Sequence, residues 1–250
     1  MDIIQRTLTA WKLLSWRQLR LRIDHCPVCD RPRPILRLDH NEVSIRCLVC
    51  KSSIITMSLI SVLNRLVKDL LEKSVYELSS RGPLFTYLSA HTRQLTVSEM
   101  FDDIEPGSMK DGVPCQNVEQ LTFSDETFDV CTSTEVFEHV ADDRKGFSEI
   151  YRVLKPGGWF VFTVPLRSDR QTMERARKIG PNHIAHLLPP EYHGDHLRGR
   201  RNVLAFRTYG TDIIDRLTGC GFETAAVHRP THPLPFDFNP PVIAARKSVS

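Results

Sequence analysis

The sequence predicts an α/β protein in which a doubly wound sheet follows a small cysteine-containing module. Two observations support this fold class. From residue 57 to residue 246, short β-type runs alternate with segments that have the apolar spacing of helices, which is typical of a sheet covered by helices on both faces. Before residue 57, four of the seven cysteines form two closely spaced pairs. We therefore expect an N-terminal module at 1–56 and an α/β domain at 57–250.

Composition sets the broad class of the protein. The chain has 250 residues, of which 41% are hydrophobic and 25% charged, and this excludes collagen, coiled-coil and disordered chains. The net charge of +3 is too small to indicate a nucleic-acid or membrane partner by itself. The uncharged stretch at 52–64 is shorter than the roughly 18 residues that a membrane helix needs. We expect no membrane span, no signal peptide, and a cytoplasmic location with reduced cysteines.

The paired cysteines predict a zinc site. Cys26 and Cys29 form one C-x-x-C pair, and Cys47 and Cys50 form a second pair 17 residues later. A two-residue spacer directs both sulfurs toward one ion, and two such pairs complete a tetrahedron. Two β-type runs lie between the pairs, so we expect a zinc ribbon whose closed site is structural. The alternative of two redox pairs is disfavoured in the cytoplasm.

The surroundings of the cysteines are basic. Residues 1–51 carry ten Lys and Arg against five Asp and Glu, whereas the remaining residues carry 23 against 25. Residues 3–21 place apolar side chains among basic ones with the spacing of a short amphipathic helix. Such a helix either packs on the protein or contacts nucleic acid or a membrane surface.

The elements of the α/β domain follow in chain order. Helical spacing predicts helices at 57–73, 143–154 and 211–219, and one at 83–91 with proline in its first turn. Runs of β-forming residues predict strands, and a nearly continuous apolar run among them is typical of a strand buried on both faces. The expected strands are 74–78, 94–99, 127–133, 159–164, 225–228 and 242–245.

Three motifs in this domain resemble class I S-adenosylmethionine-dependent methyltransferases of the type 11 group. They are L-T-F-S-D-E-T-F-D-V at 121–130, T-E-V-F-E-H-V at 134–140, and E-I-Y-R-V-L-K-P-G-G at 149–158. The resemblance covers roughly residues 74–165, and the order of elements extends it to about residue 246. It implies a Rossmann-like doubly wound sheet, S-adenosylmethionine as cofactor, and methyl transfer as the reaction.

The resemblance also implies where the amino-acid part of the cofactor binds. Glu77 matches the acidic residue that ends the first strand, and the following loop corresponds to Ser79, Ser80, Arg81 and Gly82. In the family, glycines in this loop let the backbone approach the cofactor, and the next helix contributes its N-terminus. This loop has fewer glycines than the family usually has, which leaves open a catalytically degenerate module that only binds the cofactor.

The nucleoside part has its own candidates. Glu99 lies 22 residues after Glu77 and is expected to accept hydrogen bonds from both ribose hydroxyls. By the resemblance, Asn117 and Val118 stand where the family contacts adenine. Thr134 follows a buried strand and is expected beside the transferred methyl group.

Residues 165–207 form a long insertion after a central strand, and we expect them to act as a substrate lid. Nine Lys and Arg against four Asp and Glu in this lid suit an anionic acceptor. Removing a proton from an oxygen or nitrogen acceptor needs a base, and histidine is the usual one near neutral pH. The candidate catalytic residues are His193 first, then His139, Asp195 and Tyr192.

The leading interpretation is a methyltransferase that acts on oxygen or nitrogen of a small molecule, a glycan or a nucleotide sugar. A homodimer is compatible with it. One alternative is an RNA methyltransferase, because a four-cysteine zinc module before such a domain is similar to ribosomal RNA guanine methyltransferases. The other alternative is the degenerate cofactor-binding module.

Overall fold

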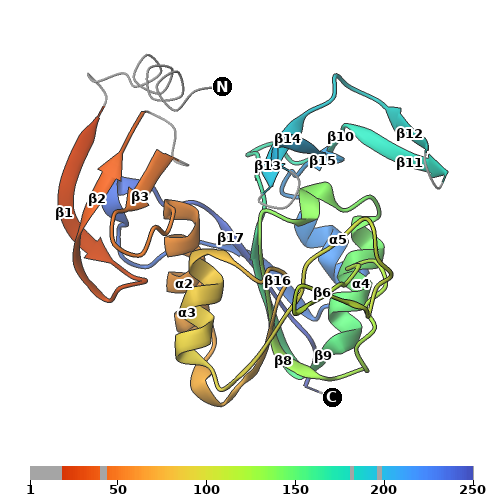
Figure 1. Cartoon of the computed structure of the whole chain (residues 1–250), viewed down its shortest axis with the longest axis horizontal. Helices are drawn as coiled ribbons and strands as arrows, with labels where there is room; N and C mark the ends of the chain where they lie inside the picture. The colour runs from red at the N-terminus through yellow and green to blue at the C-terminus, as the bar shows by residue number, and fades with distance from the viewer. Residues whose placement is uncertain (1–18, 40–43, 181–182, 196–198, 250) are drawn as a thin grey trace.

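The computed structural model describes residues 19–39, 44–180, 183–195 and 199–249 (Figure 1). Its centre is a six-stranded sheet in the order β16-β17-β9-β8-β4-β5. The four strands β5, β4, β8 and β9 are parallel, whereas β17 is antiparallel to β9 and β16 is antiparallel to β17. The bounds are β4 Ser74–Glu77, β5 Gln94–Val97, β8 Phe128–Thr134, β9 Leu154–Thr163, β16 Thr224–His228 and β17 Val242–Arg246.

The strand order contains a reversal beside β4. The chain leaves β4, passes through α3 (Gly82–His91) and adds β5 on one side, and β8 later pairs with the opposite side of β4. In a doubly wound sheet, ligands bind at the carboxyl ends of the strands where the order reverses. A ligand site is therefore expected at the carboxyl ends of β4, β5 and β8.

Helices cover both faces of the sheet, α2 (Ile54–Leu66) and α3 on one face and α4 (Asp143–Val153) and α5 (Ile213–Gly219) on the other (Figure 1). Side chains alternate accordingly along each strand. Val130 packs in the apolar cluster with α2 and α3, whereas its neighbour Cys131 packs in the cluster with α4 and α5. Two buried layers on a mostly parallel sheet confirm the predicted fold class.

Helix α2 begins three residues earlier than predicted and is shorter. The Ser53 hydroxyl accepts a hydrogen bond from the Thr56 N–H at 3.2 Å, which caps the helix at its start. Asp69 then has a left-handed backbone with φ of 53°, so the chain continues only as a 3-10 turn, η2 (Leu70–Glu72). The expected domain boundary at residue 56 consequently falls inside α2.

Strand β9 also begins before its predicted start and includes the Pro-Gly-Gly segment. Gly158 has no room for a side chain there, because a Cβ would lie 2.8 Å from the Lys155 carbonyl oxygen and 3.0 Å from that of Asp129. The apolar part of the strand behaves as expected, since Phe160, Val161 and Phe162 are all fully buried.

The N-terminal module is a three-stranded antiparallel sheet of β1 (Arg20–Cys26), β2 (Arg31–Arg37) and β3 (Ile45–Cys47). The amphipathic helix expected at 3–21 is therefore wrong at its end, because Arg20 and Leu21 pair with β2 across the hairpin. Residues 3–18 of that expected helix lie outside the described residues.

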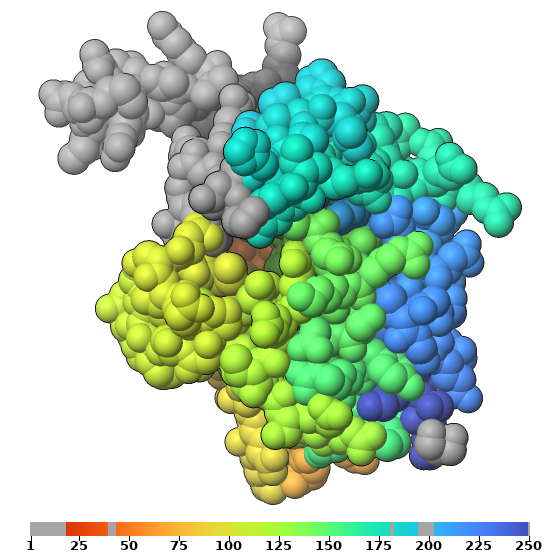
Figure 2. Space-filling view, turned by 90° about the vertical axis from the view of Figure 1, so that its right-hand side faces the viewer, coloured from red at the N-terminus to blue at the C-terminus, as the bar shows by residue number. Residues whose placement is uncertain are grey.

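The insertion after β9 folds into paired short strands, and Figure 2 shows it in cyan over the green surface around α4. Arg207 anchors its base, because the buried guanidinium donates to the carbonyls of Phe137, Val140 and Ala141. The pairs are β10 (Met173–Glu174) with β15 (Arg207–Thr208), β11 (Ala176–Gly180) with β12 (His183–His186), and β13 (Tyr192–Asp195) with β14 (Gly199–Leu204).

Four short elements complete the described chain. They are β6 (Met109–Lys110), β7 (Val113–Pro114) and the 3-10 turns η3 (Phe137–His139) and η4 (Pro235–Asp237). Among the described helices, none has the length and apolar content that crossing a bilayer requires.

Candidate functional site

The loop after β4 is held by the predicted ribose carboxylate. Oε1 of Glu99 accepts hydrogen bonds from the backbone N–H and the hydroxyl of Ser80, both at 2.9 Å, and from the Ser79 hydroxyl at 3.2 Å. The two serines thus connect the loop at 79–82 to the residue that follows the neighbouring strand. Arg81 is exposed, and Gly82 has a φ of 89° with nothing within 4 Å of where a Cβ would be, so the retained glycine occupies the position that needs one.

Glu77 ends β4 as a buried carboxyl group. Its side chain is 2% exposed and accepts a hydrogen bond from the Thr132 hydroxyl on β8. Burial raises the pKa of Glu77 to about 8, against 4.5 for an ordinary glutamate. The group therefore holds a proton near neutral pH until a donor or a cation approaches it.

The predicted adenine residues form a tight turn. The side-chain oxygen of Asn117 accepts the Glu119 backbone N–H at 3.0 Å, and its carbonyl oxygen accepts from the Gln120 N–H at 2.8 Å. Val118 is half-buried and packs on the main core cluster. One of the two lone pairs of Asn117 Oδ1 is therefore used within this turn.

Polar atoms without partners gather at the carboxyl ends of β8 and β9. The hydroxyls of Ser133, Thr134 and Thr163 are buried, and none has a hydrogen-bond partner among the described residues. Thr134 and Thr163 are direct neighbours in the pairing of the two strands. Unsatisfied buried hydroxyls are costly, so this edge suits a polar ligand. Of the three, Thr134 is a predicted site residue, and the sequence analysis missed Thr163, which looks like an ordinary strand residue.

Two of the four candidate bases come together at this end of the sheet. His139, on η3, and His193, on β13 of the lid, approach with Nε2 and Nδ1 3.2 Å apart. Glu138 lies beside both and is fully buried, and the sequence analysis missed it. Glu138 is a charged residue beside a histidine, and nothing in the sequence there indicates that it is buried.

The other two candidate bases are placed differently. Tyr192 is 45% exposed and precedes His193 on β13, so their side chains leave opposite faces of that strand. Asp195 ends the same strand, but its side chain lies outside the described parts of the chain. The described geometry therefore assembles the two histidines without Tyr192.

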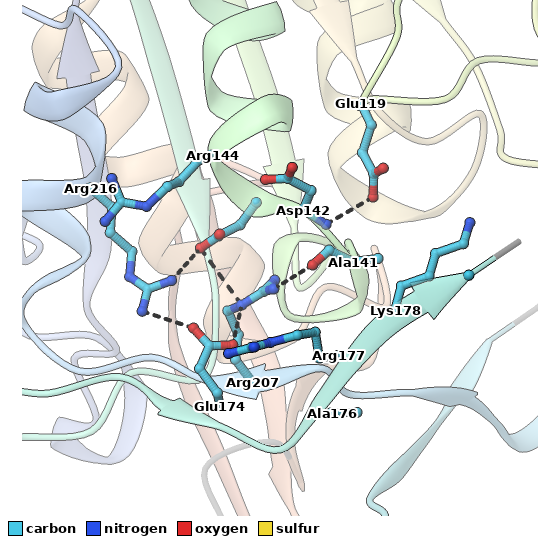
Figure 3. Close-up of a pocket in the computed structure, with 12 residues that line it drawn as sticks. Glu119, Ala141, Asp142, Arg144, Glu174, Ala176, Arg177, Lys178, Arg207 and Arg216 are labelled. Carbon is cyan, nitrogen blue, oxygen red and sulfur yellow. Dashed lines mark hydrogen bonds and ion pairs between the residues drawn. The ribbon is translucent and has the colours of Figure 1, made fainter. Parts of the chain in front are cut away.

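A cavity of about 590 Å³ lies between the start of α4 and the lid strand β11 (Figure 3). Two arginines that line it already form ion pairs, since Arg207 and Arg216 both contact Glu174 and Asp143. Three further cations form no ion pair within the described part of the chain. They are Arg144, Arg177 and Lys178.

The four paired cysteines converge in the N-terminal module. The sulfurs of Cys26 and Cys50 are 3.7 Å apart, and those of Cys29 and Cys47 are 4.0 Å apart. Four sulfurs at about 2.3 Å around a tetrahedral zinc ion are separated by about 3.8 Å, so the arrangement fits that ion. Burial raises the pKa of the Cys26 thiol, because the thiolate is poorly solvated there. A bound cation would stabilise the thiolate and offset this penalty.

Part of the chain is similar to known proteins. Residues 82–162 match a family described as "Methyltransferase domain". The matched segment runs from the start of α3 into β9 and makes up about a third of the chain. A solved S-adenosylmethionine-dependent methyltransferase from Mesorhizobium loti is 14% identical, with a TM-score of 0.47, covering 74% of this chain and 96% of that one.

Curated relatives match over shorter segments. A ubiquinone/menaquinone biosynthesis C-methyltransferase of Vibrio parahaemolyticus is 36% identical over 73 residues, which is 29% of this chain and 27% of that protein. A ubiquinone biosynthesis O-methyltransferase of Coxiella burnetii is 30% identical over 79 residues, 32% of this chain and 33% of that one. A dimethylglycine N-methyltransferase of Parasynechococcus marenigrum is 41% identical over 73 residues, 29% and 26% of the two chains. The matches thus span no more than a third of these relatives.

Proposed function

We propose that the protein transfers a methyl group from S-adenosylmethionine to an oxygen or nitrogen of a small-molecule, glycan or nucleotide-sugar acceptor. One observation carries this proposal: Glu77 and Glu99 stand at the carboxyl ends of adjacent parallel strands, linked through the loop at 79–82. This is the reversal point of a doubly wound sheet, where such folds bind nucleotides. The named curated relatives methylate carbon, oxygen or nitrogen, which supports the reaction and leaves the acceptor atom open.

The residues at the reversal point match the parts of the cofactor. Glu99 can exchange its bonds with Ser79 and Ser80 for bonds from the ribose hydroxyls, because a carboxylate accepts several donors. Asn117 and Val118 flank the position expected for adenine. Glu77, Gly82 and the start of α3 lie where the amino-acid part is expected, with exposed Arg81 available to its carboxylate.

Bound S-adenosylmethionine supplies a methyl group on a sulfonium, and a lone pair of the acceptor displaces S-adenosylhomocysteine from that carbon. The chain must then position the acceptor and receive its proton. His193 and His139, which lie 3.2 Å apart, are our first candidates for this role. Asp195 and Tyr192 remain candidate bases.

An anionic acceptor suits the cavity under the lid. The carboxylates there are occupied, since Glu119 accepts the Asp142 N–H and Asp142 accepts the Lys145 N–H. Arg144, Arg177 and Lys178 are left to bind an acceptor phosphate or carboxylate. The zinc that we propose for the cysteine site is structural, because four thiolates leave no open position.

RNA is the second candidate acceptor, and the exposed arginines of the N-terminal module favour it. Arg20, Arg22 and Arg31 are all exposed on β1 and β2. A polyanion would bind such a surface with strong salt dependence.

The test is to supply labelled S-adenosylmethionine to an extract of the source cells and to separate metabolite, glycan, RNA and protein fractions. We expect label in the metabolite or glycan fraction, and none with Glu99→Ala. Label in RNA that decreases when Arg20 and Arg22 become glutamine would select the RNA alternative. Binding of S-adenosylhomocysteine without any transfer would support the degenerate module.

A further inference from the structure

Three side chains outside the cysteine module converge on one point between the sheet and the lid. They are Glu138 and His139 on η3 and His193 on β13. The separations are 3.7 Å from Glu138 Oε1 to His139 Nε2, 3.8 Å from Glu138 Oε1 to His193 Nδ1, and 3.2 Å between the two nitrogens. A point equidistant from three such atoms lies about 2.1 Å from each, which is the length of a zinc–nitrogen or zinc–carboxylate bond.

The outer nitrogen of each histidine fixes which nitrogen faces that point. His139 Nδ1 lies 2.8 Å from the Leu204 carbonyl oxygen, which can only accept, so Nδ1 carries the hydrogen. His193 Nε2 lies 3.1 Å from Glu191 Oε1, a carboxylate oxygen that also accepts. In the neutral imidazoles, the lone pairs of His139 Nε2 and His193 Nδ1 therefore point at each other.

Glu138 adds a carboxyl group to the same point. The side chain is fully buried, and neither of its oxygens has a hydrogen-bond partner among the described residues. Both of its contacts with the histidines are too long for hydrogen bonds. Burying an unpartnered carboxylate next to two lone pairs is unfavourable unless a cation lies among them.

Each of the two histidines also makes the outer hydrogen bond that is typical of a metal ligand. A ligating histidine usually donates its other N–H to a carboxylate or a backbone carbonyl, which orients the ring. Here Glu191 has that role for His193 and the Leu204 carbonyl has it for His139. Glu191 is itself held by Arg175, whose Nη2 lies 2.6 Å from Oε2.

We propose that Glu138, His139 and His193 bind one divalent transition-metal ion of the zinc class. Two imidazoles and one carboxylate suit such an ion and leave coordination positions open for a ligand, unlike the four-cysteine site. The ion also ties the lid to the sheet, because His193 belongs to β13 and the other two ligands follow β8.

The open position gives the ion a role that rests on the proposed methyl transfer. A hydroxyl bound to a divalent metal would lose its proton to water at a lower pH than a free hydroxyl. If His193 and His139 hold the ion, the metal would replace them as the group that activates an acceptor oxygen. Metal binding itself needs no cofactor or acceptor, so it is tested independently of the reaction.

The experiment uses the full chain, stripped of metal and then loaded with one equivalent of Zn²⁺ for the cysteines. Titration with Co²⁺ is followed by visible absorption and by calorimetry. We expect a second equivalent to bind with ligand-field bands and no added thiolate charge-transfer absorption. His193→Ala and Glu138→Gln should each weaken this second binding at least tenfold, whereas His186→Ala, an exposed histidine of the same lid, should leave it unchanged.

Two results would overturn the proposal. One is the absence of a second equivalent at micromolar Co²⁺ or Zn²⁺, which would mean that a proton joins the two histidines. The other is equal binding by wild type and His193→Ala. Circular dichroism and retention of zinc by the cysteines verify that each variant is folded. S-adenosylhomocysteine binding, measured separately, shows whether the proposed function fails by itself.

Discussion

The Glu99 carboxylate and the Ser80 backbone N–H lie 2.9 Å apart, so the end of β5 holds the loop that follows β4. This contact joins two segments that the cofactor would have to bridge. It also means that Glu99 supports the loop before any ligand binds. Changes at Glu99 should therefore affect cofactor affinity through both the ribose and the loop.

We predict that Glu99→Gln weakens binding of S-adenosylhomocysteine. The amide keeps the shape but loses the charge and one acceptor, and hydrogen bonds to a charged group contribute about 1.5–3 kcal/mol, or roughly 10- to 100-fold in affinity. Calorimetry of wild type and variant measures the change. Glu105→Gln, at an exposed glutamate of the following loop, is the matched control. Unchanged affinity of the Glu99 variant would remove Glu99 from the site.

Glu77 makes the stability of the protein depend on pH. Its pKa is about 8 in the folded chain because of burial, and near 4.5 when unfolded. Between these values the unfolded chain loses the proton and the folded chain keeps it, so the free energy of unfolding falls by about 1.4 kcal/mol per pH unit as pH rises. Below pH 4.5 the carboxyl group is protonated in both states and causes no such fall.

Glu77→Gln should abolish this dependence. Urea unfolding of wild type and variant at pH 5, 6, 7 and 8 is expected to show the variant gaining stability relative to wild type at each step. The same series with Glu105→Gln should show a constant difference. A constant difference for the Glu77 variant would contradict the raised pKa.

Arg207→Met should destabilise the protein by about 3 kcal/mol or more, because it leaves the buried Asp143 and the carboxylate of Glu174 with less compensation. It also removes the donors that hold the lid base on η3. Urea denaturation measures the loss, and Arg170→Ala, exposed in the same insertion, should change stability little. Equal stability of both variants would show that the anchor contributes nothing.

Metal removal from the cysteine site should destabilise the N-terminal module. We expect tight binding of one zinc ion that Cys26→Ser combined with Cys47→Ser abolishes, and cobalt in its place should give thiolate charge-transfer absorption. Cys220→Ser, a half-buried cysteine outside the cluster, is the control. A metal-free chain with the same thermal midpoint as the zinc-loaded chain would contradict the structural role.

Much of the sheet was predictable, because each strand carries its own signal. Phe160 and Phe162 belong to an apolar run that burial on both faces requires, and Gly82 marks the turn into α3. One error came from a contact between segments and the other from a local helix cap. Leu21 lies in a strand and not in a helix, because β2 supplies its pairing partner. Helix α2 begins earlier than predicted, because the Ser53 hydroxyl caps it.

The residues of the candidate site also differ in how far the sequence predicts them. The cysteine pairs and the carboxylates after β4 and β5 could be identified in the sequence, because a two-residue spacer or a strand end limits where a side chain can lie. His139 and His193 were identified only as separate bases. Nothing near residue 138 in the sequence indicates that Glu138 is fully buried between them.

The sequence by itself determined the doubly wound sheet, the four-cysteine module and the carboxylates that follow β4 and β5, since these depend on short spacings and on the alternation along each strand. Only the tertiary structure decided that His193 meets Glu138 and His139. The two histidines are 54 residues apart, and they meet because buried Arg207 and the pairing of β13 with β14 fold the lid back onto η3. Such a contact depends on packing between distant segments, which no local pattern of residues encodes.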